Sequence, residues 1–152
     1  MVLGGSKRGS KTKPRERGPG EDRPYLVFIS HSSRDAWIAS MMSEKVSALG
    51  AEAWLDVKDL EGGDVITQKI LDGLDACQEA VVLISPNSVG SQWVVFEIGA
   101  VWGQHKRITP ILNNVSFEAI APLKEVKAVD LNDFDRFLAE LEKRIRRKTA
   151  EG

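Results

Sequence analysis

The sequence contains a single cysteine, Cys77, among its 152 residues. One cysteine excludes an internal disulfide framework and is typical of a reducing compartment, so we expect a cytoplasmic protein. With only two histidines beside it, the chain lacks the ligand set of a structural zinc site, and we expect no metal. No apolar run approaches the roughly 18 residues that cross a bilayer, and residues 1–20 lack the apolar segment of a signal peptide. The sequence therefore predicts a soluble protein that does not enter a membrane.

Several motifs of nucleotide and ester chemistry are also missing. No G-x-x-x-x-G-K-S/T segment occurs, which excludes P-loop nucleotide hydrolysis. Residues 29–33, which we expect to form a strand-to-helix turn, contain no glycine, and this excludes the dinucleotide fingerprint of hydride-transfer enzymes. There is no G-x-S-x-G elbow, and Ser30 and His31 are adjacent on one turn, where a nucleophile and its base cannot easily form their hydrogen bond. The sequence thus argues against a serine hydrolase.

The charge is unevenly distributed along the chain. Residues 1–24 hold seven of the 21 basic side chains and three of the 22 acidic ones, which leaves 14 basic and 19 acidic side chains for the rest. We therefore predict a disordered basic leader over residues 1–24, a mildly acidic domain over 25–148 and a short disordered tail over 149–152. A domain without a basic face argues against nucleic acid as the main partner. Contact of the leader with nucleic acid or acidic lipid is the minor alternative.

Short apolar runs without polar alternation are typical of strands that are buried on both faces of a sheet. Such runs occur at residues 25–30, 53–56, 80–85, 108–112 and 127–131. The segments between them have helical periodicity or helix-capping residues. The expected helices are one capped by Ser32 or Ser33 that carries Trp37, Met41, Val46 and Leu49 and stops at Gly50, one capped by Asp64 with Ile66, Ile70 and Leu74 on one face, one over residues 91–104, and a terminal one with Phe134, Phe137, Leu138, Leu141 and Ile145.

Alternation of strands and helices predicts an α/β fold, namely a flavodoxin-like open, five-stranded parallel sheet with helices on both faces. In such sheets ligands bind beyond the carboxyl ends of the strands, near the point where the strand order reverses. The loops after Ser30, Asp56 and Ser85 are therefore the places where we expect a site.

The helix expected at residues 91–104 is apolar on nearly all sides and carries one acid, Glu97, on the same face as Trp93. A carboxylate in apolar surroundings loses its water, which costs free energy unless it is paired or protonated. Functional sites tolerate such a placement. An ordinary ion pair with a lysine or arginine from a neighbouring loop fits equally well, and the residue pattern leaves both interpretations open.

From residue 25 to residue 145 the chain resembles the TIR (Toll/interleukin-1 receptor-like) domain family, particularly its stand-alone prokaryotic members. Each matching segment is weak alone, and the resemblance rests on their order and spacing. The segments are Val27–Ser32, Ala53–Asp56, Leu60–Asp64, Leu83–Ser88, Ser91–Glu97 and Ile108–Ile111.

The resemblance implies one of two functions. Many bacterial, plant and axonal TIR domains cleave NAD between nicotinamide and ribose with a glutamate in a Trp-x-x-x-Glu helix, and Glu97, with Trp93 as its partner, matches that pattern. NAD is then the substrate, no cofactor is needed, and the product is ADP-ribose or a cyclic isomer. The alternative is a non-catalytic scaffold that signals through TIR–TIR contacts. A nucleoside deoxyribosyltransferase-like enzyme also uses a glutamate at an anomeric carbon, but the loop pattern argues against it.

Aromatic rings can stack on nicotinamide or adenine, and the amides and hydroxyls of a turn that opens a helix can hold a pyrophosphate. On this basis the predicted substrate-binding residues are Trp93, Phe28, Ser30, His31, Ser32, Arg34, Trp54 and Asp56. The rings of Phe28 and Trp54 also fit a place in the core. Arg34 equally fits a solvated side chain, and Asp56 a cap of its own loop.

The resemblance also implies self-association. In the family, the loop that matches Leu60, Gly62 and Gly63 changes position when TIR domains pack head to tail, and glycine makes such movement easy. Trp102 fits either this assembly or ordinary packing. A chain with one domain and a leader has no effector of its own, so we expect a diffusible nucleotide signal to a separate effector, as in Thoeris-type antiphage systems. NAD depletion without a signal is the nearest rival.

Overall fold

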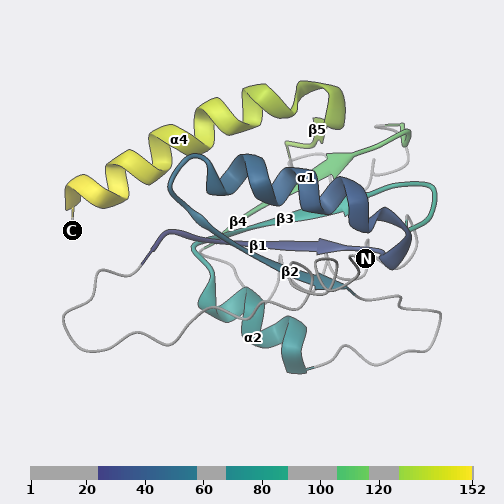
Figure 1. The fold of residues 1–152 in the computed structure, drawn as a ribbon, viewed down its shortest axis with the longest axis horizontal. Coiled ribbons are helices and arrows are strands. Elements are labelled where there is room, and N and C mark those ends of the chain that lie inside the picture. The colour runs from purple at the N-terminus through teal and green to yellow at the C-terminus, as the bar shows by residue number, and fades with distance from the viewer. Residues whose placement is uncertain (1–23, 58–67, 89–105, 117–126, 152) are drawn as a thin grey trace, which may run out of the picture.

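The computed structural model describes residues 24–57, 68–88, 106–116 and 127–151 (Figure 1). The side chains of Asp56, Val57, residues 69–71 and Glu151 lie outside this description, as does almost the whole predicted leader. The described strands form one parallel sheet in the order β2-β1-β3-β4-β5, which is the flavodoxin-like order and confirms the predicted fold class. The strands are β1 (Leu26–His31), β2 (Glu52–Val57), β3 (Glu79–Ile84), β4 (Arg107–Leu112) and β5 (Val129–Asp130).

Helices cover both faces of the sheet, as predicted. Figure 1 shows α1 (Ala36–Ser47) and α4 (Phe134–Glu151) on one face and α2 (Gln68–Ala76) on the other. Two short 3-10 turns, η2 (Ser33–Asp35) and η4 (Leu131–Asp133), lead into α1 and α4. In the described part of the chain, no helix is both long and apolar enough to cross a membrane.

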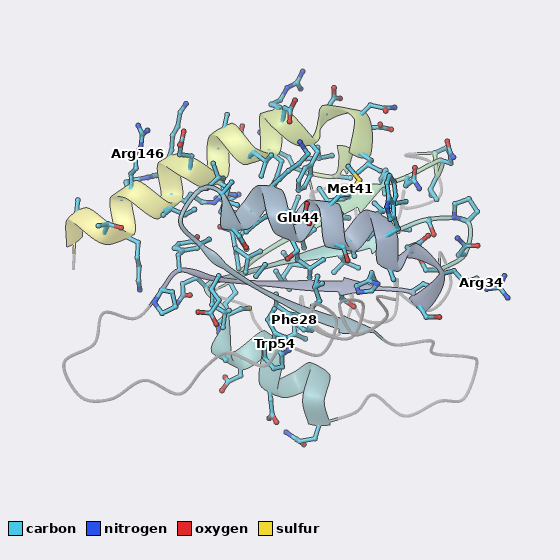
Figure 2. All side chains as sticks on the ribbon, viewed as in Figure 1. Phe28, Arg34, Met41, Glu44, Trp54 and Arg146 are labelled. Carbon is cyan, nitrogen blue, oxygen red and sulfur yellow. The ribbon has the colours of Figure 1, made fainter. Side chains whose placement is uncertain are left out.

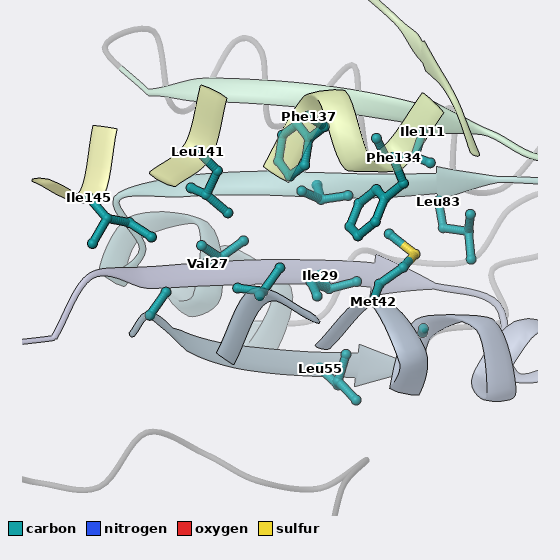
Figure 3. Close-up of a cluster of buried hydrophobic side chains, with 14 residues drawn as sticks. Val27, Ile29, Met42, Leu55, Leu83, Ile111, Phe134, Phe137, Leu141 and Ile145 are labelled. Carbon is teal, nitrogen blue, oxygen red and sulfur yellow. The ribbon is translucent and has the colours of Figure 1, made fainter. Parts of the chain in front are cut away.

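The larger core lies under α1 and α4 (Figure 3). Alternate residues of a strand point to opposite faces of a sheet, so Val27 and Ile29 of β1 face these two helices. The helices contribute a buried stripe each, and the terminal stripe matches the prediction. The helical members are Ala39, Met42 and Val46 from α1 and Phe134, Phe137, Leu141 and Ile145 from α4.

Helix α1 presents a different face to the sheet from the one that its largest apolar residues suggest. Trp37 is 74% exposed and Met41 is 39% exposed, whereas Met42 and Val46 are buried. Met42 and Val46 pack in the same buried cluster as Phe134 and Phe137 of α4, so this side of α1 faces the sheet. The chain leaves α1 through a turn that ends at Gly50, whose φ of 95° favours glycine, as the predicted helix stop requires.

The described element boundaries lie close to the predicted ones, within about three residues. The first strand lies one residue later than predicted and ends at His31. The third strand lies one residue earlier than predicted and starts at Glu79. Helix α4 continues through Glu151, beyond residue 148, where we predicted the tail to begin. The last turn carries Lys148 and Thr149, and the hydroxyl of Thr149 donates to the carbonyl of Ile145 at 3.0 Å. Both of these residues are exposed.

The smaller core lies under α2 and contains Phe28 and Trp54, two of the aromatic residues that were predicted to touch substrate. Phe28 and Trp54 are 1% and 6% exposed, and their rings meet edge to face with centroids 5.4 Å apart. Gly73 of α2 lies directly against them. A Cβ atom at position 73 would lie 2.8 Å from Cε1 of Phe28 and 3.1 Å from Cζ3 of Trp54. Helix α2 therefore approaches the sheet closely because position 73 has no side chain.

Gly73→Ala is expected to lower the free energy of unfolding by about 1 kcal/mol. Overpacking against two rigid rings costs about 1–3 kcal/mol, which outweighs the gain of about 1 kcal/mol in helix propensity. Urea unfolding of the variant beside Asp75→Ala, an exposed change on the same helix, checks this. A variant as stable as Asp75→Ala would contradict the close packing of α2.

The single cysteine lies buried at the end of α2, where its thiol donates to the carbonyl of Leu74 at 3.4 Å. Burial raises the pKa of the Cys77 thiol to about 11. The unfolded chain releases this proton near pH 8.5, so the contribution of the thiol to stability is complete below that pH and is lost as the pH rises toward 11.

At pH 8 we expect iodoacetamide to alkylate folded Cys77 at least about a hundredfold more slowly than the same residue in denaturant, because the thiolate is the reactive form. Mass spectrometry at timed intervals measures both rates. Ser47→Cys in a Cys77→Ala background, which presents a thiol at an exposed position, is the control and should react rapidly without denaturant. Equal native and denatured rates for Cys77 would show that the thiol is not buried.

Candidate active site

Two turns lie side by side at the carboxyl edge of the sheet. One follows β1 and the other follows β3, and these strands are hydrogen-bonded neighbours through pairs such as Ser30 with Val82. The strand order reverses between them, because the chain moves from β1 outward to β2 and then returns to the other side of β1. This is the position at which flavodoxin-like sheets bind their ligands.

The turn after β1 is buried and polar. Ser30, His31 and Ser32 are each 3% exposed or less. The carbonyl of Ser32 lies 2.8 Å from Nδ1 of His31 and can only accept, so Nδ1 carries the hydrogen and Nε2 is the acceptor of the neutral ring. The side-chain oxygen of Ser32 accepts from the amide of Arg34 at 3.2 Å, and its carbonyl accepts from the amide of Asp35 at 3.0 Å. The turn thus uses two of its own amides to hold its shape.

The turn after β3 is built from hydroxyl groups. The amide of Ser85 donates to Oγ of Ser88 at 3.1 Å, and the amide of Asn87 donates to Oγ of Ser85 at 3.1 Å. A backbone bond from Ser88 to the carbonyl of Ser85 closes the turn at 3.0 Å. Ser85 and Ser88 are buried, whereas Asn87 is exposed. From Ser88 the chain continues toward Trp93 and Glu97.

Asp35 joins the two turns. Its carboxylate is 3% exposed and accepts from Oγ of Ser85 at 2.5 Å and from Nδ2 of Asn87 at 3.0 Å. Sequence reasoning missed this residue, because an aspartate just before a helix looks like an ordinary cap and its partners are 50 and 52 residues away. The only available signal was its position after a strand whose loop was already a candidate.

The predicted substrate-binding residues fall into separate groups. Ser30, His31 and Ser32 lie together in the first turn, and Arg34 is exposed beside them, projecting outward in Figure 2. The backbone of Asp56 pairs in register with Ser30, which brings the end of β2 to the same edge. Phe28 and Trp54 lie in the core between the sheet and α2 (Figure 2), where packing alone accounts for them. Their contact with substrate stays a prediction.

The predicted catalytic glutamate and its partner, Glu97 and Trp93, lie outside the described residues, as do the predicted assembly residues Leu60, Gly62, Gly63 and Trp102. No group of three or more histidine, cysteine or acidic side chains in the described ranges could hold a metal ion.

A separate groove of about 300 Å³ lies between α1 and the start of α4. Its lining includes the exposed Trp37 and Met41 together with Phe134 and Asp135. None of the predicted site residues lines it. The groove is therefore distinct from the polar turns that follow β1 and β3.

The fold and this edge define a doubly wound α/β domain with two polar turns at its strand-order reversal. The family model described as "TIR domain" matches residues 27–145, so the chain belongs to the TIR family. It is 30% identical over 120 residues to a protein named 2' cyclic ADP-D-ribose synthase BtTIR from Bacteroides thetaiotaomicron, covering 76% of this chain and 42% of that protein.

Two further comparisons agree with this assignment. A protein named NAD(+) hydrolase TcpC from Escherichia coli is 29% identical over 104 residues, which is 64% of this chain and 34% of that protein. The chain thus spans less than half the length of either curated relative. The solved TIR domain of a Toll-related receptor from Hydra magnipapillata superposes with a TM-score of 0.56 at 22% identity, covering 79% of this chain and 97% of that one.

Proposed function

We propose that this chain cleaves the bond between nicotinamide and ribose in NAD, with Glu97 as its catalytic residue. The observation that carries the proposal is the Trp-x-x-x-Glu segment at residues 93–97. In the sequence this segment ends nine residues after Ser88, the last residue of the turn that follows β3. That turn lies at the ligand-binding edge of the fold. Relatives named for NAD cleavage and for cyclic ADP-ribose synthesis match the chain across this domain, which supports the same chemistry here.

Departure of nicotinamide breaks the glycosidic bond, and both of its electrons leave with the nicotinamide nitrogen. The nitrogen is cationic in NAD, so nicotinamide departs as a neutral ring and no acid has to protonate it. Positive charge develops on the ribose, as in other glycosidic cleavages. A carboxylate at Glu97 stabilises this charge more in the transition state than in the ground state, which is the requirement for catalysis.

The end of the reaction depends on the nucleophile that reaches the ribose carbon. Water forms the new C–O bond, loses a proton and gives ADP-ribose, whereas a hydroxyl or ring nitrogen of the same molecule gives a cyclic isomer. Both products start from the same cleavage. We propose the polar turn of Ser30, His31 and Ser32 as the seat of the pyrophosphate, with Arg34 exposed beside it to supply positive charge. NAD is the substrate, and the proposal requires no cofactor.

The direct test is to incubate the full chain with NAD and to separate the products by chromatography and mass. We expect free nicotinamide together with ADP-ribose or an isomer that is lighter by one water. The assay is run across a range of protein concentrations, because an assembly-dependent enzyme gains specific activity as the concentration rises. Intact NAD at every concentration would overturn the proposal and would leave a non-catalytic TIR scaffold as the function.

We further propose that the reaction takes place in the cytoplasm, that TIR–TIR self-association accompanies it and that its nucleotide product reaches a separate effector as an antiviral signal. The single cysteine supports the reducing compartment. Gel filtration with and without NAD tests the self-association.

A further inference from the structure

The carboxylate of Asp35 occupies the N-cap position of α1 but does not cap that helix. A cap aspartate normally accepts from the amides of the first helical turn. Here both carboxylate oxygens accept instead from the turn after β3. One accepts from the hydroxyl of Ser85 at 2.5 Å, and the other accepts from the side-chain amide of Asn87, through Nδ2, at 3.0 Å. We call this pair of bonds the Asp35 bridge.

Asp35 is only 3% exposed, and burial of its carboxylate costs free energy unless its oxygens accept hydrogen bonds. The two bonds of the Asp35 bridge meet this requirement. Its short contact with Ser85 is of the charge-assisted kind, and the amino end of α1 adds favourable partial charge. The backbone also forms hydrogen bonds at both ends of the bridge. The backbone amide of Asp35 donates to the carbonyl of Ser32, and the backbone amide of Asn87 donates to Oγ of Ser85. The bridge therefore joins two already closed turns into one unit.

We propose that Asp35 is a positioning residue for NAD cleavage. It holds the turn of Ser30 to Ser32, which carries the proposed pyrophosphate seat, at a fixed distance from the turn of Ser85 to Ser88, from which the chain runs on to Glu97. This inference rests on the proposed function. In this proposal Asp35 acts through the relative position of the two turns and not by contact with the reacting atoms, and small errors in such positions are costly in rate.

The hydrogen bonds of the Asp35 bridge indicate which substitution tests it. Two donors, Ser85 and Asn87, face the carboxylate, so Asp35→Asn removes the negative charge that both of them face and replaces one acceptor oxygen by an NH₂, which weakens the charge-assisted bond with Ser85. The double variant Asp35→Asn with Asn87→Asp restores both bonds. The amide at position 35 then donates to the carboxylate at position 87 and still accepts from Ser85. The new charge at position 87 stays hydrated because that side chain is exposed.

The experiment measures kcat and KM for nicotinamide release by the full chain, at a temperature well below the unfolding midpoint of each variant. We expect Asp35→Asn to lower kcat by about tenfold or more. The double variant should return kcat to within about threefold of the parent. Asp75→Asn, an exposed change on α2, is the matched control and should leave both constants unchanged.

The proposal is overturned by a folded Asp35→Asn variant with the kcat and KM of the parent, or by a double variant no more active than the single one. A parent chain that releases no nicotinamide overturns the proposed function instead, and the two failures are distinct because the parent itself is then inactive. Where Asp35→Asn does not fold, Asn87→Ala removes one bond at an exposed position, and unchanged kcat in that variant also overturns the proposal.

Discussion

Glu97→Gln is expected to reduce nicotinamide release by at least about a hundredfold, with the variant still folded. Glutamine has nearly the shape of glutamate but no negative charge, so it cannot stabilise the positive charge that develops on the ribose. Loss of one preorganised charge-stabilising group costs roughly a factor of a hundred to a thousand in kcat. The assay follows nicotinamide by chromatography under saturating NAD, so that a change in KM does not mimic the effect.

Glu44→Gln is the matched control for this substitution. Glu44 is exposed on α1, on the outside of the molecule in Figure 2, and its neutralisation should leave kcat within about twofold of the parent. If Glu97→Gln retains the rate of Glu44→Gln, the catalytic carboxylate is not at position 97. Thermal unfolding of both variants separates a lost active site from a lost fold.

The competing interpretation of Glu97 is a structural ion pair, which requires a cation. Among the described residues, the two half-buried cations already have other partners. Arg144 pairs with Glu79 through Nε at 2.7 Å, and Lys106 donates to the carbonyl groups of Leu74 and Asp75 at the end of α2. The remaining described lysines and arginines are exposed. The Glu97→Gln assay decides between the catalytic and the structural interpretation.

The sequence predicted the sheet well, because buried parallel strands read as continuous apolar runs. β1 and β3 were recognisable from Leu26–Ile29 and Ala80–Ile84 alone, and the strand order followed from the rules for parallel crossovers. The rotation of α1 was not predictable in this way. Trp37 is the largest apolar residue of that helix and is exposed, whereas Met42 and Val46 pack in a cluster with residues of α4, about 90 residues further along the chain.

The candidate site was predictable only to the level of its loops. The turn after Ser30 was placed correctly at the ligand-binding edge, since carboxyl ends of parallel strands share one edge. The bonds that shape the site were not predictable. Asp35 meets Ser85 across 50 positions, and Glu79 meets Arg144 across 65, so no local pattern links either pair. Such long-range polar contacts can be identified only from the folded structure, in which residues that are far apart in the sequence become neighbours.

The ion pair between Glu79 and Arg144 lies at the amino end of β3, opposite the candidate site. Glu79 is fully buried, and Arg144 donates to its two carboxylate oxygens at 2.7 and 2.9 Å. The phenol of Tyr25 donates to the same carboxylate at 2.5 Å, and burial together with this bond raises the pKa of Tyr25 above its usual range. Burial lowers the pKa of Arg144, but the bonds and charge of Glu79 outweigh it and raise that pKa overall. The Arg144 guanidinium therefore stays charged throughout the physiological range.

Arg144→Met is expected to lower the free energy of unfolding by about 3–5 kcal/mol, because it leaves the Glu79 carboxylate buried without its cation. That is a large part of the roughly 5–15 kcal/mol that stabilises a domain. Urea unfolding measures the change. Arg146→Met is the matched control on the same helix. Its side chain is 76% exposed and lies 3.6 Å from Glu142, and its loss should cost less than about 1 kcal/mol.

Adding Glu79→Leu to Arg144→Met should recover most of the lost stability, because the second change removes the unpaired charge and replaces it with apolar surface. The recovery distinguishes an uncompensated charge from lost packing of the Arg144 side chain, which also lies 5.8 Å from the ring centroid of Phe137. A double variant as unstable as Arg144→Met would assign the loss to packing. Because the pair lies at the amino edge, we expect the double variant, once folded, to keep the nicotinamide-release rate of the parent.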